Sequence, residues 1–179
     1  MSAEEEAPSE ELGERPRDPG PLETVFAGLR KLPDTRGAVE GVLLFVMVAA
    51  AGIWAAQSGM FQLNPIQRSS VFLLSVSAFV VPALAEELAF RGWLRRGAPI
   101  SAVVSLLAYI VWHPLQTWLH LPFGRPEFLD PRFLSLIAWL GLACTLSRVR
   151  SGSIWPPVII HWGIVVVWKA LYGGEALGS

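Results

Sequence analysis

Three ionisable side chains stand close together in an otherwise apolar stretch of the chain. They are Glu86, Glu87 and Arg91. If this stretch is helical, Glu87 and Arg91 are four residues apart and share a face, while Glu86 lies about 100° around the helix from Glu87. The spacing predicts that Arg91 neutralises Glu87 and that Glu86 points elsewhere, without a partner on its own helix. A carboxylate kept unpaired in a dry environment is a candidate general base or general acid.

Two histidines lie in other apolar segments of the chain, at His113 and His161. A lone membrane histidine is usually an interhelical hydrogen-bonding group, and charges at a helix end often reach the lipid headgroups. These ordinary interpretations stay open for each residue alone. Glu86 and His161 each lie about 12 Å from the same end of their predicted helices, at 1.5 Å per residue. Such depths are compatible with one cavity that holds the acid and both imidazoles, which favours hydrolytic chemistry.

The composition is that of a membrane protein. Of 179 residues, 53% are apolar and 16% are charged, and the mean hydropathy is +0.46, whereas an average soluble domain is about 25% charged. Residues 1–40 hold ten of the fifteen acids, so residues 41–179 carry five acids and nine bases. These values exclude a soluble enzyme, a nucleic-acid-binding protein and a disordered adaptor as first interpretations.

Five apolar segments are long enough, or nearly so, for membrane spans, which need about 20 residues. We expect an all-α, polytopic membrane helix bundle of about five transmembrane helices, at residues 39–59, 69–94, 100–119, 133–146 and 154–171. The fourth segment looks short, and Pro82 is expected to bend the second. Residues 1–36 are predicted to be a disordered acidic, proline-rich tail. This tail contains a short amphipathic helix at residues 24–32, and residues 37–179 form the membrane domain.

The Lys and Arg residues near the segment ends predict the orientation in the membrane. With the N-terminus in the cytoplasm, eight of them lie on the inside and four on the outside. The inside residues are Arg30, Lys31, Arg36, Arg91, Arg95, Arg96, Arg148 and Arg150, and the outside residues are Arg68, Arg125, Arg132 and Lys169. The chain is therefore expected to be a multi-pass protein of the plasma or inner membrane with a cytoplasmic N-terminus.

The order of these polar residues resembles the CAAX prenyl endopeptidase and bacteriocin-processing (CPBP) family, whose members are all-helical intramembrane glutamic proteases. The resemblance covers about residues 69–171. It rests on Glu86-Glu87-x-x-x-Arg91, on Tyr109 four residues before His113, and on His161 in the last segment. The resemblance implies that Glu86 activates a water molecule with the help of His113. It also implies that Glu87 and Arg91 shape the site, and that His161 helps to stabilise the oxyanion.

The chain departs from the family pattern at two positions. The family usually has Phe four residues before the first histidine, where this chain has Tyr109, which is a mild change. The family has a polar residue, usually Asn, four residues after the last histidine, where this chain has Val165. Loss of one oxyanion-hole donor can cost about 10²–10³ in rate. Gln116 lies three residues after His113 on roughly the same helix face, so we expect its amide to be the replacement donor. Trp112, Trp162 and Trp168 lie near the histidines in the sequence and are candidates to line a substrate groove, with helix packing as the alternative role.

The resulting hypothesis is an intramembrane endopeptidase that acts near the C-terminus or membrane anchor of a membrane-associated protein, on a CAAX-like or sorting-signal substrate. One alternative is a non-catalytic relative that binds a membrane peptide, as an immunity or scaffold protein would, and another is a small transporter or proton relay. The expected partners are the lipid bilayer and a protein or peptide substrate, without nucleic acid. No cofactor is expected, although a zinc ion held by Glu86, His113 and His161 stays a lesser alternative.

Overall fold

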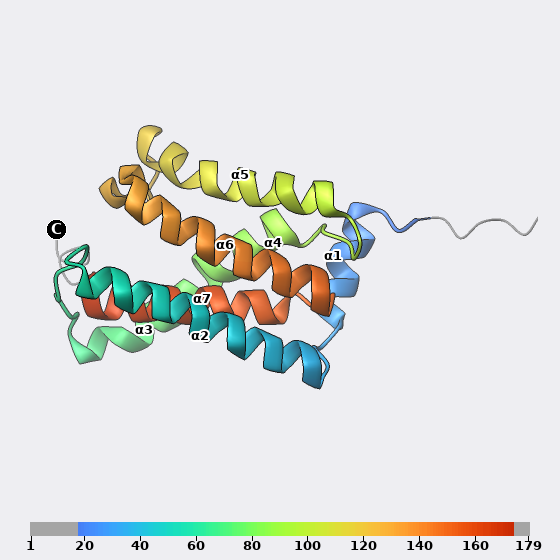
Figure 1. Cartoon of the computed structure of the whole chain (residues 1–179), viewed down its shortest axis with the longest axis horizontal. Coiled ribbons are helices and arrows are strands. Elements are labelled where there is room, and N and C mark those ends of the chain that lie inside the picture. The colour runs from blue at the N-terminus through green and yellow to red at the C-terminus, as the bar shows by residue number, and fades with distance from the viewer. Residues whose placement is uncertain (1–17, 174–179) are drawn as a thin grey trace, which may run out of the picture.

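The helices of the chain run side by side and form one bundle, with a short helix across one of its ends (Figure 1). The computed structural model describes residues 18–173, and no strand occurs among them. The all-α prediction is confirmed. In chain order the elements are α1 (Pro21–Arg30), α2 (Thr35–Gln57), α3 (Arg68–Ala78), η1 (Phe79–Leu84), α4 (Ala85–Arg91), α5 (Pro99–Trp118), η2 (Pro126–Leu129), α6 (Pro131–Ser151) and α7 (Trp155–Tyr172).

The helix ends follow from local sequence signals. At the start of α2, the Asp34 side chain accepts a hydrogen bond from the Gly37 N–H at 2.7 Å, which caps the helix. Helices α5 and α6 begin with Pro99 and Pro131, where a missing N–H costs no hydrogen bond. Helix α6 ends at Ser151, and the next residue, Gly152, has a φ of 69°, which is left-handed and favours glycine.

The second apolar segment is broken in the middle, as the proline predicts. It consists of α3, the wider turns of η1 and then α4. Val81 has φ −135° and ψ 117°, which is not helical, and Pro82 follows it. Proline cannot donate a backbone hydrogen bond, so the regular helical ladder is interrupted here. The break gives α4 its own start, directly before the two glutamates.

Four helical stretches are long and apolar enough to cross a membrane. They are Thr35–Gln57, Arg68–Arg91, Pro99–Trp118 and Pro131–Ser151. The protein is therefore a multi-pass membrane protein. The expected fifth span is α7, an 18-residue helix that carries two prolines, His161 and Lys169 and is not among these four. Its crossing of the membrane stays a prediction.

The fourth segment is longer than the apolar pattern indicates. We expected residues 133–146, but α6 has 21 residues and continues to Ser151. Its last turns contain Ser147, Arg148 and Ser151, which are polar but buried. The Ser151 hydroxyl donates to the Ser147 carbonyl at 2.7 Å, and Arg148 binds several carbonyl groups. Because the Arg148 and Ser151 side chains are hydrogen-bonded inside the protein, the helix does not need apolar residues at these positions.

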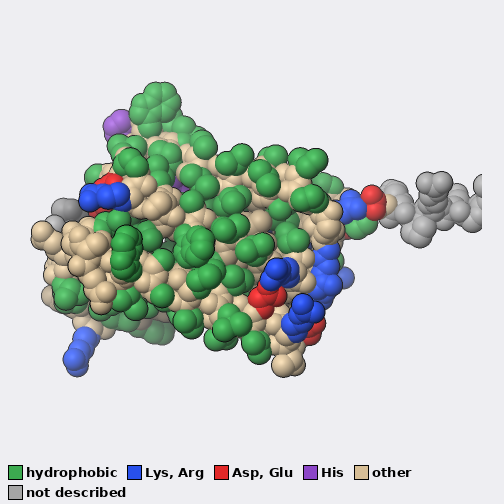
Figure 2. Space-filling view, in the orientation of Figure 1, with side chains coloured by type: hydrophobic (Ala, Val, Ile, Leu, Met, Phe, Trp, Pro, Cys, Tyr) green, Lys and Arg blue, Asp and Glu red, His purple; other side chains and the backbone are tan. Residues whose placement is uncertain are grey.

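The outer face of the bundle is apolar. Large hydrophobic side chains on α2, α3 and α5 are exposed, among them Leu43, Trp54, Phe72 and Ile100. Figure 2 shows green hydrophobic side chains over much of the visible face, with charged side chains gathered mainly towards the ends of the bundle. Soluble monomers rarely expose continuous apolar surface of this kind, so the face is suited to contact lipid.

Helix α1 packs on the end of the bundle and begins three residues earlier than expected. The predicted helix at residues 24–32 corresponds to Pro21–Arg30. The Trp155 indole donates to the Leu29 carbonyl at 2.9 Å, and the Ile154 N–H donates to the Gly28 carbonyl at 3.2 Å. Residues 1–17 of the predicted tail lie outside the described residues. The division of the chain at residue 36 stays a prediction.

Arg148 joins α1, α4 and α6 and is not the flanking charge that the sequence suggested. Its side chain is 3% exposed. It donates to the Arg91 carbonyl at 3.1 Å, to the Gly92 carbonyl at 2.9 Å and to the Thr24 carbonyl at 3.4 Å. Arg91 is buried too, so six rather than eight basic residues support a cytoplasmic N-terminus. The orientation stays a prediction.

We predict that Arg148→Lys destabilises the protein, because an ammonium group cannot reach carbonyls in several directions as the planar guanidinium does. Each charged hydrogen bond that is lost is expected to cost about 1.5–3 kcal/mol. The thermal unfolding temperature in detergent measures this effect. Arg150→Lys is the matched control, because Arg150 is exposed and pairs only with Glu40. Equal unfolding temperatures for the two variants would contradict the role assigned to Arg148.

Candidate active site

The predicted ion pair is formed at the centre of the bundle. Glu87 and Arg91 on α4 are both fully buried, and Arg91 Nη1 lies 2.9 Å from Glu87 Oε1. Arg91 also reaches α6, where Nη2 donates to the Gly141 carbonyl at 3.4 Å and Nε to the Thr145 hydroxyl at 3.5 Å. Its guanidinium carbon lies 3.9 Å from the centre of the Tyr109 ring on α5. The cation is thus held by a carboxylate, a carbonyl, a hydroxyl and an aromatic face.

The same oxygen of Glu87 also holds His161. His161 Nδ1 on α7 lies 2.9 Å from Glu87 Oε1. Because Arg91 favours the ionised form of Glu87, the histidine is the donor in this hydrogen bond and Nδ1 carries the proton. The other ring nitrogen, Nε2, is then turned towards Glu86, with 3.9 Å between Nε2 and Glu86 Oε2. Glu87 therefore fixes both the orientation and the tautomer of His161.

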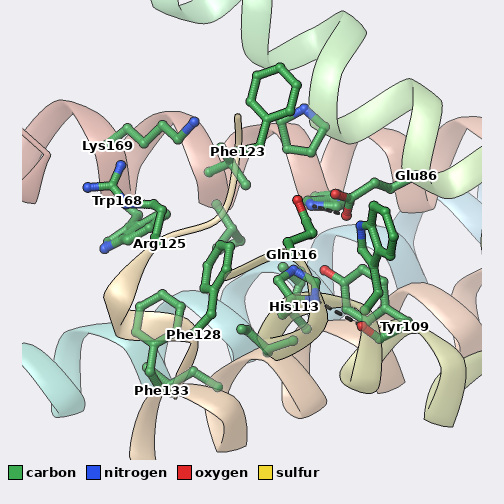
Figure 3. A pocket seen from close by; sticks show the side chains of 18 of the residues that line it. Glu86, Tyr109, His113, Gln116, Phe123, Arg125, Phe128, Phe133, Trp168 and Lys169 are labelled. Atoms are coloured by element: carbon green, nitrogen blue, oxygen red, sulfur yellow. Dashed lines mark hydrogen bonds and ion pairs between the residues drawn. The ribbon is translucent and has the colours of Figure 1, made fainter. Parts of the chain in front are cut away.

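Glu86 faces a cavity instead of joining this network, as its position on the helix predicts. Its side chain is 15% exposed. Oε2 is shielded and makes no hydrogen bond with any residue in the described range 18–173. The cavity has a volume of about 510 Å³ and is lined mostly by apolar side chains. Glu86, Tyr109, His113 and Gln116 lie around it (Figure 3). A buried acceptor without a partner is unusual in a folded protein and suits a group that receives a ligand.

His113 reaches the same cavity from α5. Its Nδ1 lies 2.9 Å from the Tyr109 carbonyl, and because a carbonyl can only accept, Nδ1 carries the proton. The ring is held edge-on by Phe128, with 4.9 Å between the ring centroids, and by Tyr109, with 4.7 Å. Nε2 of His113 is thus left as the acceptor. The structure brings both predicted histidines to the cavity that Glu86 faces.

Gln116 and Trp162, the two residues predicted to contact the substrate, lie in different places. Gln116 is 4% exposed and lines the cavity, close to His113 (Figure 3). Trp162 is not among the lining residues. Its indole donates to the Ser75 carbonyl at 2.8 Å, and it packs edge-on against Phe79. Adjacent residues point about 100° apart on a helix, so Trp162 faces α3 while His161 faces the site. These contacts join α7 to α3, as the packing alternative for Trp162 predicts, and contact of Trp162 with a substrate stays a prediction.

Several lining residues, among them Ile164, Phe128 and Phe133, went unrecognised in the sequence. On α7 the lining residues are His161, Ile164, Val165, Trp168 and Lys169, and on α5 they are Tyr109, Trp112, His113 and Gln116. The other α7 residues lie three, four, seven and eight positions after His161, and on α5 Tyr109 lies four before and Gln116 three after His113, so a search at these spacings would have found them. Trp112 is adjacent to His113 and does not follow this spacing. Arg125 and Phe128 come from the connection between α5 and α6, where no periodic signal exists.

No group of three or more His, Cys, Asp and Glu side chains within residues 18–173 is arranged to hold a metal ion. Glu86 and His161 approach each other, but Glu87 already occupies the other nitrogen of His161. The arrangement has one carboxylate oxygen without a hydrogen-bonding partner in residues 18–173 and two imidazoles whose Nε2 atoms are open, all at one cavity. It can therefore accept hydrogen bonds from a water molecule and polarise it.

Comparison with known families agrees with this geometry. Residues 68–167 match the family model described as type II CAAX prenyl endopeptidase Rce1-like. This is more than half of the chain. The chain belongs to this family. No curated protein and no solved structure gave a match.

Membership of the Rce1-like family implies an intramembrane CAAX-type protease with a protein substrate. The matched residues contain the polar cluster in full, from Glu86 to His161. They end before Trp168 and Lys169, which line the same cavity. The Rce1-like segment thus carries the acid and both histidines, while part of the cavity wall comes from residues beyond it.

We predict that Glu87→Gln destabilises this Rce1-like protein strongly, because Arg91 is then buried without a counter-charge. Removal of one partner of a buried pair costs about 3–5 kcal/mol. Glu86→Gln is the matched control, since the adjacent glutamate faces the cavity and pairs with no arginine. Thermal unfolding in detergent should give a much lower midpoint for Glu87→Gln only. A double variant, Glu87→Gln with Arg91→Met, should recover part of the lost stability. An unaltered midpoint for Glu87→Gln together with no recovery in the double variant would contradict the pairing of Glu87 with Arg91.

Proposed function

We propose that this protein is an intramembrane endopeptidase that hydrolyses a peptide bond near the C-terminus or membrane anchor of a membrane-associated protein. One observation carries the proposal. The Glu86 carboxylate has an oxygen without a hydrogen-bonding partner in the described residues, and it lies 3.9 Å from a histidine whose other nitrogen is fixed by a buried acid. This arrangement suits a water molecule bound between an acid and an imidazole.

The proposed reaction starts with that water. Glu86 takes a proton from the water while the oxygen attacks the scissile carbonyl carbon, and a tetrahedral oxyanion forms. The C–N bond then breaks, and the proton passes from Glu86 to the leaving amine nitrogen. The products are a new carboxyl group and a new amine, so the only reagent consumed is water. The unpaired state of the carboxylate supports its assignment as the base.

The two histidines have different proposed roles because their second nitrogens differ. His113 donates through Nδ1 to a backbone carbonyl, so its Nε2 is an acceptor that can orient the attacking water. His161 is held at Nδ1 by Glu87 and turns Nε2 towards Glu86, 3.9 Å from Glu86 Oε2. This position supports the proposal that His161 contacts the reacting group and helps to stabilise the oxyanion. The proposed role of each histidine rests on the group that holds its Nδ1, the Tyr109 carbonyl for His113 and Glu87 for His161.

The walls of the cavity support an apolar peptide substrate. Phe61, Phe90, Phe128 and Phe133 are among the lining residues. An apolar cleft in a membrane protein lowers the amount of water around the scissile bond and strengthens the polar contacts made there. We infer that the substrate segment is apolar and reaches the cavity from the membrane, in the plasma or inner membrane. The cytoplasmic position of the N-terminus is also a proposal, which reporter fusions at both ends of the chain would test.

Val165 favours a second candidate function. It is buried, lines the cavity and stands where the resemblance leads us to expect a polar residue. A relative that lacks this donor and does not recruit another would bind a membrane peptide without cutting it. Such a protein would serve as an immunity or scaffold protein. Capture of membrane proteins by Glu86→Gln, followed by a cleavage assay, separates the two functions.

We predict that Glu86→Gln lowers proteolysis by about 10²–10⁴-fold, since the amide cannot act as a base. The experiment uses the full chain with its native membrane proteins. Proteins captured by Glu86→Gln are identified by mass spectrometry and then incubated with each variant, and size shifts are measured on a gel. Glu40→Gln on α2 is the control for loss of one acidic side chain. Cleavage by Glu86→Gln at the unaltered rate would eliminate the protease, and equal capture without cleavage by either form would favour the binding protein.

We predict that Gln116→Ala lowers the cleavage rate by about 10²–10³-fold, if its amide replaces the missing oxyanion donor. The fall should be in kcat more than in KM, because the contact is made in the transition state. Ser101→Ala on the same helix is the control, since its hydroxyl donates only to the Ala98 carbonyl. Unaltered cleavage by Gln116→Ala would reject this role.

A further inference from the structure

A second hollow lies at the end of the bundle where α1 packs. It has a volume of about 360 Å³ and shares no lining residue with the cavity that Glu86 faces. Its lining residues come from the start of α2, the connection between α4 and α5, and the end of α6. They are Asp34, Arg36, Gly37, Glu40, Arg96, Arg150 and Ser151, and we call the hollow that they line the end pocket. The chemistry proposed above uses none of them.

Both acids of the end pocket already have partners within the fold. Asp34 Oδ1 accepts from the Gly37 N–H at 2.7 Å and caps α2. Glu40 forms an ion pair with Arg150. Neither acid forms an ion pair with Arg36 or Arg96, the other two cations that line the pocket. The lining residues therefore keep an excess of positive charge.

Three cations at the end pocket have no acidic partner within residues 18–173. Arg96 donates through Nη2 to the Ser151 carbonyl at 2.8 Å and forms no ion pair there. The side chains of Lys31 and Arg36 make neither a hydrogen bond nor an ion pair with another described residue. Lys31 and Arg96 also converge, because a β-carbon added to Gly152 would lie 3.0 Å from Lys31 Nζ and 3.2 Å from Arg96 Nε. Like charges this close repel each other, and an anion between them is attracted to both.

The end pocket lies where the apolar sides of the bundle begin. Val39 and Leu43 follow Arg36 on the same face of α2 and are exposed, and Ile100, four residues after Arg96, is exposed as well. Figure 2 shows the charged side chains at this end next to the green hydrophobic surface. An anion bound in the pocket would therefore lie at the level of the lipid headgroups, with apolar side chains directly below it.

Helix α1 gives a second indication of this level. Leu22 and Phe26 lie four residues apart on α1, and Leu32 follows the helix closely. All three side chains are exposed, although they are large and apolar. Arg30 and Lys31 lie beside them in the sequence. Exposed apolar side chains next to cations on a short helix are typical of a helix at a membrane interface. The end of the bundle that carries the pocket is thus expected to lie among lipid headgroups.

We propose that the end pocket binds the phosphate of an anionic phospholipid headgroup, with Lys31, Arg36 and Arg96 as the contacting cations. A guanidinium offers parallel N–H groups to two phosphate oxygens, and an ammonium group adds a point charge. The occupant is a lipid and not free phosphate, because acyl chains attached to the headgroup gain contact with the apolar side chains below the pocket. The lipid is anionic, because a headgroup with its own cation would be repelled by the three cations. This site does not depend on the proteolytic function proposed above.

Native mass spectrometry of the full-length protein in detergent tests the binding. The protein is titrated with dioleoyl phosphatidylglycerol, which has a net negative charge, and with dioleoyl phosphatidylcholine, whose choline cation balances the phosphate. Inorganic phosphate is added to further samples as a competitor without acyl chains, against chloride at equal ionic strength. The variants are Lys31→Gln, Lys31→Arg, and Lys31→Gln together with Arg96→Gln. Thermal unfolding without added lipid checks that each variant is folded.

Phosphatidylglycerol is expected to bind about tenfold or more tightly than phosphatidylcholine, as one additional charged hydrogen bond would give. Lys31→Gln should reduce this preference and the double variant should remove it, whereas Lys31→Arg should retain it because the charge is kept. Since the Lys31 side chain makes no hydrogen bond within residues 18–173, Lys31→Gln tests the site without removing a contact of the fold.

Arg68→Gln is the matched control. Arg68 begins α3 at the opposite end of the bundle, is exposed and has no partner in the described residues. It lies near the exposed Phe72, as Arg36 lies near Val39, but it lines neither pocket. Its substitution should leave the preference unaltered.

Equal affinity for the two lipids would overturn the proposal, as would a preference that survives the double variant. An equal loss of preference in Arg68→Gln would overturn it too, because the effect would then belong to total charge and not to the pocket. Displacement of phosphatidylglycerol by inorganic phosphate, but not by chloride, would overturn the assignment to a lipid. No cleavage is measured, so these results are independent of whether the chain is a protease.

Discussion

One oxygen of Glu87 is the point on which the centre of the molecule depends. It meets Arg91 and His161, each at 2.9 Å. A single charge buried at this depth would be prohibitively costly, so the carboxylate requires the guanidinium and the guanidinium requires the carboxylate. Arg91 then extends to α6 through Gly141 and Thr145, and to the face of Tyr109 on α5. The requirement for electrical neutrality thereby brings α4, α5, α6 and α7 to one place, where the candidate site is built.

Close packing around this network restricts which residues fit there, as the charges do. A β-carbon added to Gly141 would lie 2.7 Å from the Tyr109 ring, so only glycine allows α6 to approach α5 so closely there. Tyr109 in turn carries the carbonyl that orients His113 and the ring that covers Arg91. The bundle has a second fixed point at the end where α1 packs, around the buried guanidinium of Arg148. The cavity lies between the outer apolar face and these two polar centres, and Glu86 Oε2 faces it without a hydrogen-bonding partner in the described residues.

The cavity is polarised along its length. An acid with a free oxygen and two histidines lie at one end, and two cations lie at the other. The apolar walls between them would hold a peptide segment without competing for its hydrogen bonds. This layout separates the acidic and the basic side chains of the cavity along its length. The two neighbouring glutamates differ in what they contact. Glu87 holds Arg91 and His161, whereas Glu86 has an oxygen available to a ligand at the cavity.

The sequence by itself determined the features that depend on a single helix. The helical class, the interruption at Pro82, the pairing of Glu87 with Arg91 and the divergence of Glu86 all follow from composition and from angles about one axis. Only the tertiary structure decided which neighbour each face meets. It turned Trp162 to Ser75, buried Arg148 among carbonyl groups, extended α6 to Ser151 and brought Arg125 and Lys169 to one cavity. The physical reason is that residue spacing fixes a direction around a helix, whereas the group that lies in that direction depends on how separate helices and their connections pack.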